Sequence, residues 1–171
     1  MKSPICDMLG IEFPLLAFSH CRDVVAAVSR AGGFGVFGAT RYLPETLEQE
    51  LKWIDDHVDG KPYGIDVLIP ENISTAGEKN VTWKSLEKRV SQEHRDFTRN
   101  LLKKYNIELT AQSVADNQPQ PFDAKTALQL LEVSFRHPIR LIANALGVPP
   151  RAMIEMGRQH NVPEIGRASC R

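Results

Sequence analysis

Three polar side chains interrupt or follow apolar runs of the sequence, where they could contact a bound ligand. Asp66 lies inside the run YGIDVLI at residues 63–69. A charged group inside an apolar strand costs free energy unless it is hydrogen-bonded or paired, so Asp66 is either a functional group or a brace for a neighbouring loop. His20 follows the first apolar run and either shapes a substrate pocket or has no role in chemistry. Asn144 follows a later run and either reaches the same site or caps a turn.

The remaining histidines and charge pairs give weaker indications of chemistry. His137 precedes Pro138 at a predicted helix end, where the helix dipole favours a cation. Histidines on or beside predicted helices are expected to be solvated: His57, His94 and His160. Two charge pairs are interpreted as solvated helix faces: Asp55 with Asp56, and Lys103 with Lys104. The three cysteines have no metal-ligand spacing, so we predict no metal site.

The stretch AAVSRAGGFGVFGA at residues 26–39 predicts a helix followed at once by a short strand. Gly32 and Gly33 end the helix, because glycine takes positive φ without a clash at Cβ. Gly38 and Ala39 then close the strand with little bulk. Small residues at the end of a parallel strand leave room for a ligand, although tight packing explains them equally well.

Short apolar runs and amphipathic segments alternate along the chain and would position these residues. Strands are predicted at residues 13–18, 34–37, 63–69 and 139–143. Helices are predicted at residues 22–31, from 44 to about 58, from 91 to about 105, at 124–135 and at 151–160. Ser91 and Asp123 are predicted N-caps, and the helix after Ser91 is expected to bury Phe97, Leu101 and Leu102. Near-continuous apolar strands that alternate with helices are typical of a buried parallel sheet in an α/β fold.

Length and composition narrow the classes of function. The chain has 171 residues, enough for one domain with a core. Its Lys and Arg residues number 21, as do its Asp and Glu residues, so bulk charge does not indicate binding to nucleic acid or an anionic membrane. No run of about 18 apolar residues predicts a membrane span, and the N-terminus lacks the apolar core of a signal peptide. The odd number of cysteines favours a reduced, cytoplasmic setting.

The last eight residues, EIGRASCR at 164–171, have no strand character, although the alternation requires a fifth strand here. They resemble the translation of a widely used sequencing-library adapter. We therefore expect no fifth strand and interpret the segment as a non-native tail, the alternative being a flexible polar C-terminus. Either interpretation excludes Cys170 as a functional thiol.

Four segments, in order and at similar spacing, resemble the nitronate monooxygenase family, also called 2-nitropropane dioxygenase-like. They are ICDMLGIEFPLL at residues 5–16, AAVSRAGGFGVFGA at 26–39, KPYGIDVLIP at 61–70 and ALGVPP at 145–150. The resemblance covers residue 1 to about residue 163. It implies the N-terminal half of an FMN-dependent (β/α)8 TIM barrel, with about four strand–helix units and with residues 71–123 as a helical or loop insertion.

The resemblance also implies roles for particular residues. Asp66 stands where the family usually has an asparagine that contacts the flavin. The first-strand loop, whose backbone approaches the flavin, contributes Ala17, Phe18 and Ser19, and its sequence AFSH departs from a family pattern like QGPM. His20 and Asn144 are weaker candidates for a substrate pocket. The family's catalytic histidine and glycine-rich phosphate segments would lie beyond residue 163, so no residue here is assigned as the catalytic base.

Three functions remain open. The first is FMN-dependent oxidation of alkyl nitronates with dioxygen by the whole protein. The second is another flavin-dependent reaction on the same barrel, such as enoyl reduction with a nicotinamide donor. The third is a non-catalytic fragment, whose unpaired edge strands and exposed interior invite self-association and which binds no stoichiometric FMN. The expected partners are a small-molecule substrate and dioxygen; neither the natural substrate nor the oligomeric state is indicated.

Overall fold

The computed structural model describes residues 3–40, 42–69, 87–110, 124–145 and 148–166. The chain forms two compact units, one made of Met1–Glu71 with Ala124–Arg171 and the other of Asn72–Asp123. The second unit starts one residue after the start of the insertion predicted at residues 71–123, and both end at residue 123.

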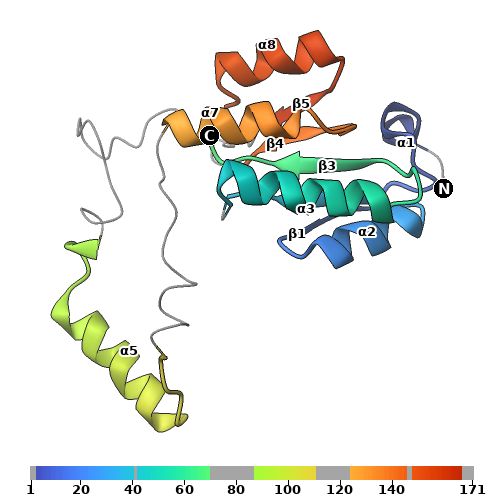
Figure 1. Cartoon of the computed structure of the whole chain (residues 1–171). Coiled ribbons are helices and arrows are strands. Elements are labelled where there is room, and N and C mark those ends of the chain that lie inside the picture. Colours follow the sequence, from blue (N-terminus) through green and yellow to red (C-terminus); the bar gives the residue numbers. More distant parts are fainter. Residues whose placement is uncertain (1–2, 41, 70–86, 111–123, 146–147, 167–171) are drawn as a thin grey trace. The chain divides into compact units, whose positions relative to one another are not determined.

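The larger unit is built on a five-stranded parallel sheet with the order β1-β2-β3-β4-β5 (Figure 1). Its strands are β1 (Leu16–Ser19), β2 (Phe34–Gly38), β3 (Tyr63–Asp66), β4 (Ile142–Asn144) and β5 (Glu164–Gly166). Every strand pairs with the next one along the chain. Sequential parallel order is that of a (β/α)8 barrel, because a doubly wound sheet reverses its order at a switch point.

A helix separates each strand from the next (Figure 1). These helices are α2 (Arg22–Arg30), α3 (Pro44–His57), α7 (Ala124–Ser134) and α8 (Arg151–His160), and α1 (Pro4–Leu9) precedes β1. Helix α2 packs on β1 and β2, α3 packs beside both α2 and α7, and α8 contacts β5. The unit therefore consists of four strand–helix repeats and a fifth strand.

Two apolar clusters lie on opposite faces of the sheet, since successive strand residues point to opposite sides. The larger cluster joins the strands to the helices through Phe37, Ile65, Ile142, Leu51 and Leu131, with further buried neighbours. The smaller cluster lies on the other face and contains Cys6, Leu9, Ile11, Phe34, Val36 and Leu141. Helix α1 thus covers the start of this second face, which we call the inner face.

The inner face is open toward the carboxyl ends of the strands. Phe18 is in register with Val36 of the smaller cluster, and its side chain is 56% exposed. Ile165 of β5 is in register with Ala143 and is 45% exposed. An apolar core covers the helix side of the same strands, so these exposed side chains mark the side on which a barrel encloses its interior.

The predicted strands and helices are present with shifted ends. Strand β1 begins at Leu16 rather than at residue 13, because Pro14 has no N–H to donate to a ladder. The predicted N-cap Ser91 accepts a hydrogen bond from the His94 N–H. Helix α1 (Pro4–Leu9) is not among the helices predicted from the sequence. The predicted N-cap Asp123 lies outside the described residues.

Strand β5 contradicts the expectation that residues 164–171 contain no strand. Ala143 of β4 pairs in parallel with Ile165, and the Ile142 N–H donates to the Pro163 carbonyl over 3.1 Å. A short edge strand is held by its backbone ladder on one side, so it does not need the apolar run that identifies a central strand. The non-native origin of residues 164–171 stays a prediction, and 167–171 lie outside the described residues.

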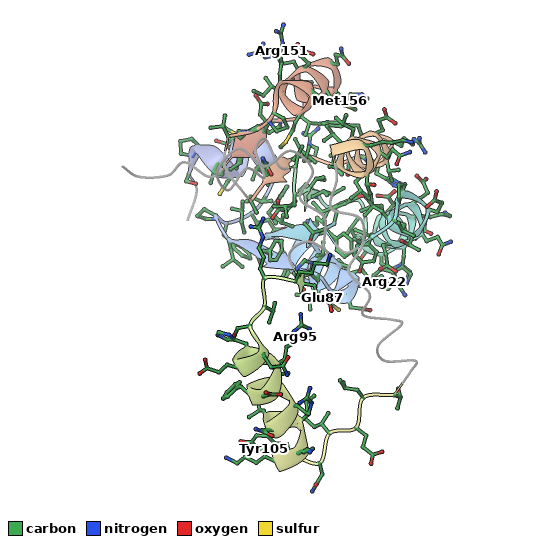
Figure 2. All side chains as sticks on the ribbon, turned by 90° about the vertical axis from the view of Figure 1, so that its left-hand side faces the viewer. Arg22, Glu87, Arg95, Tyr105, Arg151 and Met156 are labelled. Atoms are coloured by element: carbon green, nitrogen blue, oxygen red, sulfur yellow. The ribbon has the colours of Figure 1, made fainter. Side chains whose placement is uncertain are left out.

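The second unit contains α5 (Gln92–Lys104), whose side chains project on all sides in Figure 2. The expectation that this helix buries Phe97 and Leu101 is wrong, because they are 66% and 43% exposed. Within residues 87–110, no residue of the helix is buried. Periodicity predicted the helix correctly, but an apolar stripe is buried only where another element packs on it.

Across the described part of the chain, no helix is both long enough and apolar enough to span a membrane.

Candidate functional site

The carboxyl ends of β1, β2 and β3 bring His20, Gly38 and Asp66 together on the inner face. Gly38 and Asp66 are in register, and His20 follows Ser19, which is in register with Phe37. Parallel strands end at one edge of a sheet, where (β/α)8 barrels place their ligand sites. Two of the three polar residues predicted from the sequence therefore lie at one site.

His20 is fixed by the backbone of the neighbouring strand. Its Nδ1 lies 2.9 Å from the Gly38 carbonyl oxygen, which can only accept, so Nδ1 carries the hydrogen. The Phe18 ring meets the imidazole edge-on, with the ring centroids 5.1 Å apart. A Cβ on residue 38 would lie 2.5 Å from Nδ1 and 2.7 Å from Phe18 Cζ. Two aromatic side chains therefore fill the space at Gly38 that the sequence left open to a ligand or to packing.

Asp66 is tied to a loop through only one of its carboxyl oxygens. Oδ1 accepts a hydrogen bond from the Ala145 N–H over 3.1 Å, and in the described part of the chain Oδ2 has no hydrogen-bond partner. Burial raises the pKa of the Asp66 carboxyl, against the lowering effects of the Ala145 N–H and the charge of His20. The side chain thus braces the loop after β4 and keeps one oxygen for another contact.

The side chains of Ala17 and Ser19 lie on the helix side of the sheet. Ala17 is in register with Gly35, where a Cβ would lie 2.4 Å from the Val25 carbonyl oxygen of α2. The Ser19 hydroxyl accepts from the Cys21 N–H at the start of α2. These two residues could contact a ligand on the inner face only through their backbone, as the family resemblance implies.

Asn144 fastens loops rather than facing the inner side of the sheet. Its side chain is almost fully buried. Oδ1 accepts from the Ile69 N–H over 3.1 Å, and Nδ2 donates to the carbonyl oxygens of Ile69 and Val148 over 3.3 Å each. The amide is thereby occupied by backbone groups, which agrees with the turn-bracing alternative.

A partly buried polar cluster at the opposite end of the strands was not predicted. The Tyr63 hydroxyl donates to Asp55 Oδ1 over 2.7 Å, and His137 Nδ1 donates to Asp55 Oδ2 over 2.6 Å. Glu48 Oε1 lies 3.4 Å from His137 Nε2. The expected solvated position of Asp55 is therefore wrong, because a carboxylate beside a buried tyrosine and a buried histidine supplies their hydrogen-bond acceptor. Burial and Asp55 together raise the pKa of Tyr63.

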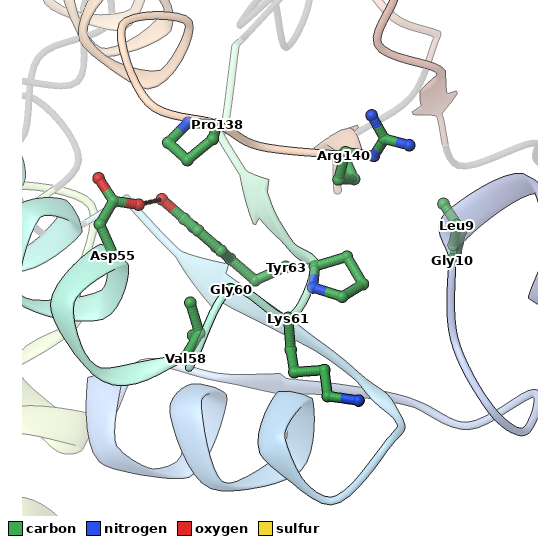
Figure 3. A pocket seen from close by; sticks show the side chains of 10 residues that line it. Leu9, Gly10, Asp55, Val58, Gly60, Lys61, Tyr63, Pro138 and Arg140 are labelled. Carbon is green, nitrogen blue, oxygen red and sulfur yellow. Dashed lines mark hydrogen bonds between the residues drawn. The ribbon is translucent and has the colours of Figure 1, made fainter.

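This cluster lies beside a pocket of about 400 Å³ (Figure 3). Leu9, Gly10, Tyr63 and Arg140 are among its lining residues. Tyr63 is the first residue of β3, so the pocket lies at the amino ends of the strands. Ligand sites of (β/α)8 barrels lie at the other end, so we infer that the residues around this pocket stabilise the fold.

His57 was also expected to be solvated. It is half-buried instead and stacks on Trp53 with ring centroids 3.8 Å apart.

Comparison with known proteins gives the relatives that this chain resembles. No protein-family model matches the chain. The Mycobacterium tuberculosis protein named "Putative monooxygenase Rv1533" is 44% identical over 168 residues, which are 95% of this chain and 44% of that protein. The Staphylococcus haemolyticus protein named "Probable nitronate monooxygenase" is 26% identical over 98% of this chain and 43% of its own length. Over nearly its whole length, this chain resembles proteins named as monooxygenases and nitronate monooxygenases.

Comparison with solved structures gives the fold that this chain resembles. A nitroalkane oxidase of Streptomyces ansochromogenes superposes with a TM-score of 0.61 at 20% identity, over 97% of this chain and 42% of that one. FabK of Thermotoga maritima, as a mutant, superposes with a TM-score of 0.59 at 18% identity, over 97% and 39%. Both are TIM barrels, and the chain covers their N-terminal part. It thus spans less than half the length of the two monooxygenases described above.

Proposed function

We propose that this chain is the N-terminal part of an FMN-dependent nitronate monooxygenase that oxidises alkyl nitronates with dioxygen. The relatives that the chain resembles support a flavin oxidoreductase. The observation that carries the proposal is the placement of Asp66 and His20 on the open inner face at the carboxyl ends of the strands. That is where a (β/α)8 barrel binds its cofactor and substrate.

The residues present fit one wall of a flavin site. The ring of Phe18 is 56% exposed and supplies apolar surface on which a flat ring system could pack. Asp66 Oδ2 supplies a polar atom. The backbone of Ala17–Ser19 lies on β1, which β2 separates from Asp66 in the sheet. We assign cofactor contact to Asp66, Phe18 and this backbone. The phosphate of FMN would be held by segments outside this chain, as the family resemblance implies.

When bound, the flavin would supply the electron acceptor for oxidation. The chain's own residues would orient the substrate. With Nδ1 donating to Gly38, His20 presents Nε2 as its remaining polar atom and can donate from it to an anionic nitronate when the ring is protonated. Asn144 would act on the pocket only by fixing the loops after β3 and β4.

Anaerobic reduction of the flavin in the full-length protein tests the proposal. Bleaching of the flavin by an alkyl nitronate, followed by reoxidation with dioxygen, is the expected result. Reduction by NADH or NADPH but not by nitronate would instead support the enoyl reductase alternative. A full-length protein purified without any flavin, and unable to take it up, would overturn both.

We also propose a cytoplasmic location. Cys6 and Cys21 are free thiols, as a reducing compartment requires.

A further inference from the structure

The Asp66 carboxyl is held in one orientation with one oxygen left for a ligand. The Ala145 N–H fixes Oδ1 from the loop after β4. On the inner face, the residues in register with Asp66 are Gly38 of β2 and Ala143 of β4. Neither of these neighbours has a polar side chain. Oδ2 therefore remains available on a face whose nearest strands offer it no donor.

Few described groups favour ionisation of this carboxyl. His20, after β1, is the titratable side chain that acts on Asp66, and the Ala145 N–H is the other favourable group. His20 is itself held by the Gly38 carbonyl through Nδ1. Burial opposes both groups and has the larger effect, so the pKa of Asp66 is raised. Neither β2 nor β4 contributes a charge at this level of the sheet.

A flavin bound over the inner face would further favour the protonated form of Asp66. The ring system would remove water from Asp66, which disfavours the carboxylate further. A carboxylate would also repel the negative charge that a flavin gains on reduction, whereas a carboxylic acid could donate a hydrogen bond to the ring.

We propose that Asp66 contacts the flavin as a neutral carboxylic acid that donates a hydrogen bond from Oδ2, so that flavin affinity depends on pH. The inference rests on the proposed flavin site. Because binding favours the protonated acid, affinity is fully present at low pH and is lost as the pH rises through the pKa of Asp66. Above the pKa of the free protein, each flavin that binds takes up one proton.

The test measures riboflavin and FMN binding to the full-length apoprotein by fluorescence quenching at a series of pH values. Riboflavin is included because the phosphate of FMN titrates near pH 6, about the second pKa of a phosphate ester. We expect Kd to rise by up to about tenfold per pH unit once Asp66 ionises. The variant Asp66→Asn keeps a donor without a titrating proton and should bind with a Kd that does not change over the same range. The control Asp56→Asn, at an exposed acid paired with Lys52, should retain the wild-type pH dependence.

Calorimetry in two buffers of different ionisation enthalpy measures proton uptake on the unmodified protein, so the test does not depend on the variant folding. Uptake approaching one proton per flavin supports the proposal. Identical pH profiles for wild type and Asp66→Asn, or binding without proton uptake, would overturn it and leave the flavin function intact. Failure of every form to bind either flavin would overturn the proposed function as well.

Discussion

Gly35 and Gly38 lie on the same strand, but replacing each with alanine should have different consequences. At position 35 the new Cβ would lie 2.4 Å from the Val25 carbonyl oxygen and 2.9 Å from the Val25 carbonyl carbon. These are backbone atoms of α2, so relief requires the helix to move by about 1 Å to reach ordinary contact. At position 38 the nearest atoms are the ring ends of His20 and Phe18, which can rotate.

The expected free energies differ by about 2 kcal/mol. Overpacking against a helix backbone costs about 3 kcal/mol, and alanine recovers about 0.5–1 kcal/mol over glycine in a strand, which leaves Gly35→Ala destabilised by about 2 kcal/mol. Gly38→Ala loses the hydrogen bond from His20, worth about 1 kcal/mol, and gains a similar amount from the backbone. Its stability should therefore stay close to that of the wild type.

Denaturant unfolding of the two full-length variants, followed by circular dichroism, gives the comparison. We expect a clear loss of stability for Gly35→Ala alone. If Gly38→Ala were destabilised as much as Gly35→Ala or more, the reasoning would be refuted. That reasoning is that residue 35 packs against the backbone of α2, whereas residue 38 packs against side chains that can rotate.

Three further results are expected. His137→Ala should lower the free energy of unfolding by about 2–3 kcal/mol, because Asp55 loses a buried partner. The control His94→Ala, at an exposed histidine, should change it by less than about 0.5 kcal/mol. Equal effects of the two substitutions in unfolding experiments would contradict a stabilising role for the hydrogen bond between His137 and Asp55. Asn144→Ala removes two buried hydrogen bonds and one part-buried one, and should cost about 2–3 kcal/mol with little change in KM, measured by unfolding and steady-state kinetics. A large KM change at unaltered stability would favour a substrate contact. The 171-residue chain alone should self-associate in sedimentation velocity and show no stoichiometric FMN absorbance, and a yellow monomer with one FMN per chain would contradict this.

The sequence predicted the strand and helix order because apolar runs and helical periodicity are local signals. Strand β5 was missed because a short edge strand depends on the ladder offered by β4, a contact that local composition does not encode. The burial of helix residues depends on neighbours in the same way, and Phe97 was expected to be buried but is exposed.

The candidate site was predicted in part. Asp66 stood out because a charge inside an apolar strand is costly. The structure shows the loop-bracing role through one oxygen, and the functional role of the other oxygen stays a prediction. The partner of His137 could not be predicted, because Asp55 is 82 residues away in the chain. A buried tyrosine at the start of a strand was the one signal that could have drawn attention to Asp55, since its hydroxyl needs a partner.

Because each strand pairs with the strand made before it, the sheet can be assembled from its N-terminal edge while the ribosome is still adding residues. Strands β1 to β3 can pair as soon as Asp66 has emerged. Strand β4 must then wait for residues 67–141, a delay of roughly ten seconds at about 5–20 residues per second. During synthesis, the edge of β3 therefore stays unpaired for longer than that of β2, which leaves it open for longer to chaperone binding or to misassociation.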